Sequence, residues 1–252
     1  MLLTIGNPKT LKGQKKGYLT AVLHLAPHTL SGRNVCPMAT AGCAAACLNT
    51  AGRGGIGLDD RHPEDHPIQG ARIRRTNWYF DDRRGFMAQL VKDVEAVVRK
   101  AKREGLTPCI RLNGTSDIRW ETVFAHRGNS VYANIMLAFP DVQFYDYTKL
   151  PNRRSLPANY HLTYSLAEGE RNQRGAEVAF DHGYNVAVVL RGCGDSQHPK
   201  PFPDTWRGRP LVDGDESDLR FLDGHGNYVG LRAKGRAKHD TTGFVYDAKE
   251  DS

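Results

Sequence analysis

The chain has 252 residues, of which 39% are hydrophobic and 25% charged, with a formal net charge of +7 and a pI near 9.2. No apolar run approaches the ~18 residues that a membrane span needs, so a transmembrane protein is not expected. The opening stretch lacks the apolar core and cleavage site of a signal peptide, and the five unevenly spaced cysteines do not suggest a disulfide framework. We therefore expect a protein of the cytoplasm.

Apolar and β-branched runs alternate with helical patterns along the chain. The predicted strands are 18–25, 107–112, 142–147, 160–166, 185–191, 210–212 and 228–231. The predicted helices are 39–48, 69–79, a long one between Asp82 and Gly105, 130–139 and 171–182. This alternation predicts an α/β protein with about seven parallel strands, forming a full or partial TIM-like (β/α) barrel in one domain over residues 1–252.

A cysteine loop at 35–57 follows the first predicted strand and holds three of the five cysteines. Cys43 and Cys47 are four residues apart in a run of small residues, so a helix there would place both on one face. Cys36 precedes that helix in a loop that could bring its sulfur to the same point. Three thiols without bulky neighbours predict a metal site, and an Fe4S4 cluster with one open iron suits three cysteines.

Other interpretations of the cysteines stay open. Cysteine is often a buried core residue, and this is the role we expect for Cys109 within its strand. Zinc fits less well, because a structural zinc site needs four ligands and paired C-x2-C units are absent. Cys193 is either a fourth ligand or an ordinary loop residue. Gly54 and Gly55 would let backbone N–H groups approach the cluster or an anionic ligand.

Polar residues recur at or just past the carboxyl ends of the predicted strands, where barrel enzymes build their active sites. The carboxylates there could serve as acids and bases, bind a divalent metal, or cap loops. Arg191 ends an apolar strand, so its charge needs a partner, and one of the aspartates at the strand ends is the expected one. The candidate catalytic residues are Asn113, Asp117, Asp146, Lys149, Arg191, Asp213 and Asp215, with Ser165 and Lys234 at the same edge.

Several segments together resemble an uncharacterised phage-encoded family, the mycobacteriophage gene-product-eighty-eight type. They are NVCPMATAGCAAACLNTAGRGG, IRLNGTSDIRWE, FYDYTKLP, HLTYSLAE and DGDESDLRFLD. More distantly, a cysteine loop after the first strand is similar to radical S-adenosylmethionine enzymes, which implies an Fe4S4 cluster and leaves S-adenosylmethionine open as a second ligand. The cysteine spacing here is C-x6-C-x3-C instead of C-x3-C-x2-C, and no Gly-Gly-Glu follows the second strand.

The sequence thus predicts an iron–sulfur barrel enzyme of phage type that acts on a small, anionic substrate in the host cytoplasm. The alternative is a protein with a structural cluster or zinc, such as a redox sensor or a nucleic-acid-associated factor. A third hypothesis is a hydrolase that uses the aspartates and a divalent metal. The basic charge leaves a nucleic-acid partner open, although no base-reading motif is present.

Overall fold

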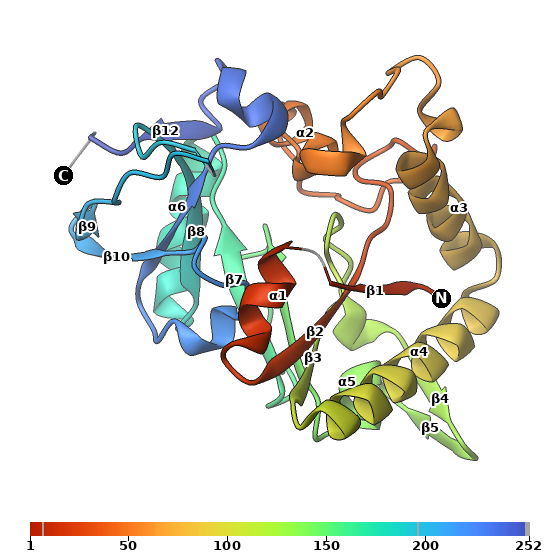
Figure 1. The fold of residues 1–252 in the computed structure, drawn as a ribbon. Helices are drawn as coiled ribbons and strands as arrows, with labels where there is room; N and C mark the ends of the chain where they lie inside the picture. The colour runs from red at the N-terminus through yellow and green to blue at the C-terminus, as the bar shows by residue number, and fades with distance from the viewer. Residues whose placement is uncertain (7, 196, 250–252) are drawn as a thin grey trace. The chain divides into compact units, whose positions relative to one another are not determined.

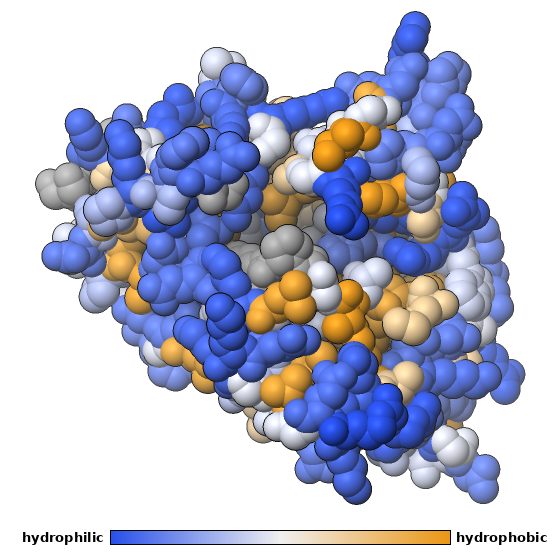
Figure 2. All heavy atoms as spheres, in the orientation of Figure 1, coloured by the Kyte–Doolittle hydropathy of each residue, from blue (hydrophilic) through white to orange (hydrophobic). Residues whose placement is uncertain are grey.

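The computed structural model describes residues 1–6, 8–195 and 197–249. The chain groups into two compact units. Unit 1 comprises Met1–Cys36, Pro67–Asp146 and Arg154–His161, and unit 2 comprises Pro37–His66, Tyr147–Arg153 and Leu162–Ser252. Hydrophilic residues cover most of the face seen in Figure 2, in keeping with the mean hydropathy of −0.55. No helix in the described part of the chain is long and apolar enough to cross a membrane.

The strands form a mixed, mostly parallel sheet of ten strands in the order β1-β2-β3-β6-β7-β8-β11-β10-β9, with β12 beside β8 (Figure 1). A separate hairpin joins β4 and β5. The strands are β1 Leu3–Ile5, β2 Tyr18–Leu23, β3 Thr107–Arg111, β4 Ala125–Arg127, β5 Ser130–Tyr132, β6 Gln143–Thr148, β7 Tyr160–Ser165, β8 Asn185–Arg191, β9 Thr205–Trp206, β10 Arg209–Asp213, β11 Tyr228–Arg232 and β12 Val245–Asp247.

The predicted seven-stranded (β/α) barrel is wrong. A barrel closes only when its outermost strands pair with each other. In the described residues the outermost strands are β1 and β9, and each is antiparallel to its single neighbour. Helical crossovers are also few, since β10 and β11 are joined by a 3-10 turn, Arg220–Leu222, with no α-helix between them. The sheet is therefore open.

Six α-helices accompany the strands in the described residues. They are α1 Pro8–Gln14, α2 Ala41–Ala45, α3 Pro67–Asp81, α4 Arg83–Glu104, α5 Ile135–Ala138 and α6 Glu170–Asp181. The long helix α4 begins and ends as the sequence predicted. The Asp82 carboxylate accepts from the Gly85 N–H at 2.9 Å, and Gly105 stops the helix with a φ of 64°. The apolar stripe of this helix packs into the core of unit 1, where Phe86, Leu90 and Val94 are fully buried.

The predicted helix over 130–139 is wrong. Residues Ser130–Tyr132 form the second strand of a hairpin with Ala125–Arg127, and only Ile135–Ala138 is helical. The turn between the two strands contains Gly128, whose φ of 58° suits a tight hairpin. The Asn134 side chain then caps α5 by accepting from the Leu137 N–H at 2.9 Å.

Unit 2 contains the parallel strands β8, β11 and β10 and residues 162–165 of β7, whose carboxyl ends lie at one edge. Helix α6 packs against β8, and residues from both belong to an apolar cluster that includes Trp206 and Tyr228. β8 changes its neighbour along its length: β7 pairs with its first half and β12 with its last residues.

Candidate functional site

The carboxyl edge of unit 2 is defined here as the residues at and just past the ends of its parallel strands. These are Ser165 and Glu168 at and after the end of β7, 191–193 after β8, 213–215 after β10, and 232–234 after β11. In open parallel sheets, ligands bind at this edge because the loops there are free to diverge around a ligand. Five of the residues predicted to lie at strand ends are found at this edge: Ser165, Arg191, Asp213, Asp215 and Lys234.

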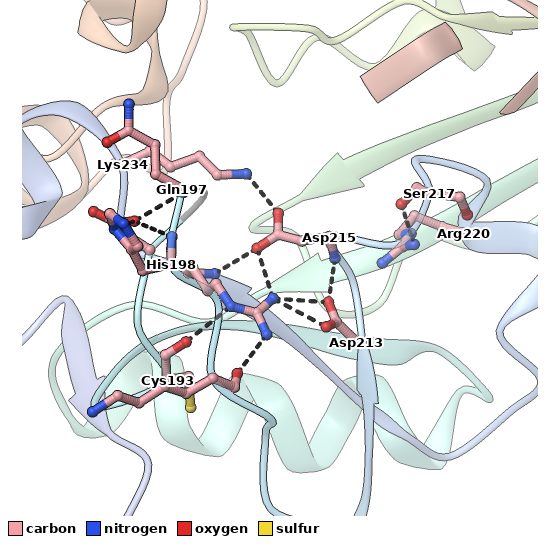
Figure 3. Close-up of polar contacts among 11 residues, drawn as sticks. Cys193, Gln197, His198, Asp213, Asp215, Ser217, Arg220 and Lys234 are labelled. Carbon is pink, nitrogen blue, oxygen red and sulfur yellow. Dashed lines mark hydrogen bonds and ion pairs between the residues drawn. The ribbon is translucent and has the colours of Figure 1, made fainter. Parts of the chain in front are cut away.

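Two aspartates and two cations form a closed ionic group at this edge (Figure 3). The buried Arg232 guanidinium donates to both carboxylate oxygens of Asp213, at 3.1 and 3.0 Å, and to Asp215 at 3.4 Å. The Lys234 ammonium donates to Asp215 at 2.6 Å. The remaining Arg232 hydrogens reach the backbone oxygens of Cys193 and Lys200. The two negative and two positive charges of the group balance. Its contacts join the loops that follow β8, β10 and β11, and the Asp213 side chain remains 30% exposed.

Arg191 contacts Asp240, which is not one of the aspartates predicted at the strand ends. Its Nη2 donates to the backbone oxygens of Asp240 and Val245, both at 3.0 Å, and lies 3.9 Å from the Asp240 carboxylate. Burial alone would raise the pKa of Asp240, but hydrogen bonds from Thr242 and Val245 outweigh it and hold the pKa below its usual value. The charged Asp240 carboxylate therefore stabilises the fold of unit 2 through the hydrogen bonds that it accepts.

The segment that contains Cys43 and Cys47, residues 40–47, contacts the carboxyl edge of unit 2 through a hydrogen bond to Glu168. Thr40 caps α2 by accepting from the Cys43 N–H at 3.1 Å, and the Glu168 carboxylate accepts from the Gly42 N–H at 2.7 Å. A Cβ on Gly42 would lie 2.2 Å from the Thr242 hydroxyl oxygen and 2.8 Å from Glu168, so these side chains would have to shift to admit a larger residue. Cys43 packs against the apolar cluster formed by Ala46, Ala167, Ala233, Ala237, Phe244 and Val245.

The expected helix over 39–48 is only five residues long, and Cys43 and Cys47 do not share a helix face. The chain bends at Cys47, with φ −54° and ψ 133°, and continues into a 3-10 turn at Leu48–Thr50. Gly54 is buried in the next turn, Gly52–Gly54. A Cβ on Gly55 would lie 2.0 Å from the Thr50 carbonyl oxygen, so the packing of the loop itself requires this glycine.

The five thiols fall into two classes by exposure. Cys36, Cys43 and Cys47 are half-buried, whereas Cys109 and Cys193 are buried and none of the five is in a disulfide. Cys109 is the predicted core residue, with its sulfur 3.1 Å from the Thr20 hydroxyl. Burial raises the pKa of the Cys193 thiol, which favours the protonated form that binds metal poorly.

No three or more His, Cys, Asp and Glu side chains in the described residues are arranged so that they could hold a metal ion. The three half-buried thiols do not form a ready ligand set here. Cys36 belongs to unit 1, and Cys43 and Cys47 belong to unit 2.

Cys36 lies against the loop after β3 in unit 1. Its sulfur accepts from the His28 N–H at 3.4 Å and lies 3.8 Å from the Thr115 carbonyl oxygen. Asp117 of the same loop donates its N–H to Val35 at 2.8 Å. This loop follows the carboxyl end of β3, which is parallel to β2. The half-buried Cys36 therefore lies at a carboxyl edge in unit 1, as Cys43 does in unit 2.

Asn113 and Asp146 meet in unit 1, where they form a buried network. The Asp146 carboxylate is fully buried and accepts from the Asn113 N–H at 2.6 Å and from the Tyr160 hydroxyl at 2.8 Å. The Asn113 side-chain oxygen accepts from Ile118 and Trp120, both at 3.0 Å. These bonds fix the loop that contains Asp117 and carries the contacts to Cys36.

Lys149 is buried in unit 2, close to the end of β7. Its ammonium donates to the Ser165 backbone oxygen at 3.0 Å and hydroxyl at 3.3 Å, and it lies 5.5 Å from the centre of the Phe244 ring. Lys149 and Cys43 thus both contact residues of the same cluster at the carboxyl edge.

Sequence reasoning missed three residues that organise the edge: Glu168, Arg232 and Asp240. Glu168 follows a predicted strand directly, so its place in the sequence could have indicated it. Arg232 ends an apolar strand in the same way as Arg191 and carried the same signal. Asp240 lies in the polar C-terminal region, where no periodic pattern pointed to it.

The fold and this edge define an open, mixed α/β protein with thiols and charged side chains at the carboxyl ends of its parallel strands. The family model described as Gene product 88 matches residues 1–248. The chain therefore belongs to the gene product 88 family, a phage-type family. Neither a curated protein nor a solved structure gives a significant match.

Proposed function

We propose that the protein is an iron–sulfur enzyme in which Cys36, Cys43 and Cys47 bind an Fe4S4 cluster. Its small, anionic substrate would bind at the carboxyl ends of the parallel strands. The observation that carries this proposal is the position of the thiols. In each unit a half-buried cysteine lies at a carboxyl edge, while the other two cysteines are buried.

The donor set supports a soft metal centre more than a hard one. Thiolates select iron–sulfur clusters, zinc or copper, whereas carboxylates and waters select magnesium and calcium. Asp213 and Asp215 are already engaged by Arg232 and Lys234, which argues against the divalent-metal hydrolase. A bound cluster with an open iron would supply a Lewis acid or an electron donor.

The first test is metal analysis of protein purified without air, with iron, acid-labile sulfide and zinc measured per chain. About four iron and four sulfide per chain, with broad visible absorbance, is the expected result. Cys36→Ser, Cys43→Ser and Cys47→Ser should each lower the iron content. Cys109→Ala is the matched control, because its thiol is buried in the core of unit 1, and should keep the cluster. Zinc alone, or no metal, would contradict the proposal.

A second test separates a catalytic cluster from a structural one. Addition of S-adenosylmethionine, or of inorganic phosphate as a simple anion, should change the electron paramagnetic resonance spectrum of an open iron. A structural cluster should keep its spectrum, and its removal should unfold the protein.

A further inference from the structure

The net positive charge of the chain arises from unit 1. Unit 1 contains 19 Lys and Arg against 9 Asp and Glu, a formal charge of +10. Unit 2 contains 16 against 19, a formal charge of −3. The first 36 residues contain no acidic side chain. A charge of this size on one unit creates a field that attracts polyanions.

The long helix α4 displays much of this charge on one face. Five exposed basic side chains lie within about 100° of arc, at about 100° per residue. They are Arg84, Lys92, Arg99, Lys102 and Arg103. Glu95 also lies on this face, but it forms an ion pair at 3.4 Å with Arg127. Exposed basic side chains therefore lie near both ends and in the middle of this face.

The basic face continues beyond the end of α4. The turn after α1 contains the exposed Lys15 and Lys16 and leads into β2. The Thr107 N–H, two residues after Gly105, donates to the Gly17 carbonyl oxygen at 2.8 Å. This bond brings the lysine turn next to the C-terminal end of α4.

This face is long enough to follow most of one turn of duplex nucleic acid. Arg84 and Arg103 are about 28 Å apart along the axis, at 1.5 Å per residue. One turn of B-DNA rises about 34 Å. We propose that unit 1 binds the phosphate backbone of double-stranded nucleic acid along α4, without reading the base sequence. Charge complementarity carries the proposal: exposed lysines and arginines neutralise phosphates, and no apolar groove is involved.

The test measures binding of the full chain to a fluorescently labelled 20-base-pair DNA duplex by anisotropy, over a series of salt concentrations. The variant is Lys92→Ala/Arg99→Ala/Arg103→Ala, because alanine preserves helix propensity. At low salt we expect roughly tenfold weaker binding or more, and a salt slope smaller by about three, one for each lost phosphate contact. An RNA duplex and a single strand of the same length show which form of nucleic acid is preferred.

The control is a pair of charge-reversal variants with equal changes of charge. Arg99→Glu/Arg103→Glu alters the α4 face, and Arg171→Glu/Arg174→Glu alters exposed arginines on α6 of unit 2. Only the first should abolish binding. Equal loss in both variants, no binding by the unchanged protein, or binding only to phosphatidylserine vesicles would overturn the proposal. The cysteine variants should bind DNA normally, so this test is independent of the cluster.

Discussion

At the scale of single residues, Gly42 holds the cysteine segment against the carboxyl edge of unit 2. Gly42→Ala would place a methyl group 2.2 Å from Thr242 and 2.8 Å from Glu168. We expect a loss of about 1–3 kcal/mol in the free energy of unfolding, because the overpacked helix must move off Glu168. Urea denaturation measures this loss. Ala45→Leu adds more bulk at an exposed position of the same helix and should change stability little.

Asp240 makes a pH-dependent contribution to stability. Its pKa is lowered in the folded state, so its contribution is complete above the ordinary value of 3.8 and is lost as the pH falls through the lower folded value. Asp240→Asn should cost about 1–3 kcal/mol at pH 7, because charge-assisted hydrogen bonds are lost. The difference between variant and unchanged protein should shrink below pH 4 in denaturation curves. A constant difference down to pH 2 would argue against this role.

At the scale of elements, α4 depends on its two ends. Asp82→Ala removes the side-chain acceptor for the Gly85 N–H, and Gly105→Ala strains a residue with a φ of 64°. Each should lower the free energy of unfolding by about 1 kcal/mol. Asp81→Ala is the neighbouring control and loses only an exposed ion pair with Arg33, which should matter less. Comparable losses for all three would show that the cap geometry is unimportant.

At the scale of the whole molecule, the charge is unevenly divided between the units. A cation exchanger senses patches of charge, so retention at pH 7 should depend on unit 1. Arg99→Glu/Arg103→Glu should elute at distinctly lower salt than Arg171→Glu/Arg174→Glu, although the two variants have the same net charge. Identical elution would mean that the α4 face is no more attractive to anions than the surface of α6.

Local sequence determined much of the secondary structure. The apolar period of α4 and its caps at Asp82 and Gly105 predicted that helix, and buried runs predicted β2, β3 and β8. Each signal is contained in a few neighbouring residues. The position of Cys109 in the core followed from the same kind of reasoning.

Tertiary structure decided the rest, because the deciding contacts join residues far apart in the chain. Alternation of strands and helices does not say whether a sheet closes. Here the antiparallel strands β1 and β9 at its edges, and β12 beside β8, keep it open. A five-residue helix is not stable by itself in water. Helix α2 is therefore stabilised by tertiary contacts, namely the hydrogen bond between Gly42 and Glu168 and the packing of Cys43. The sequence by itself determined which thiols and charges the protein has. Long-range contacts decided which of the two units each of them belongs to.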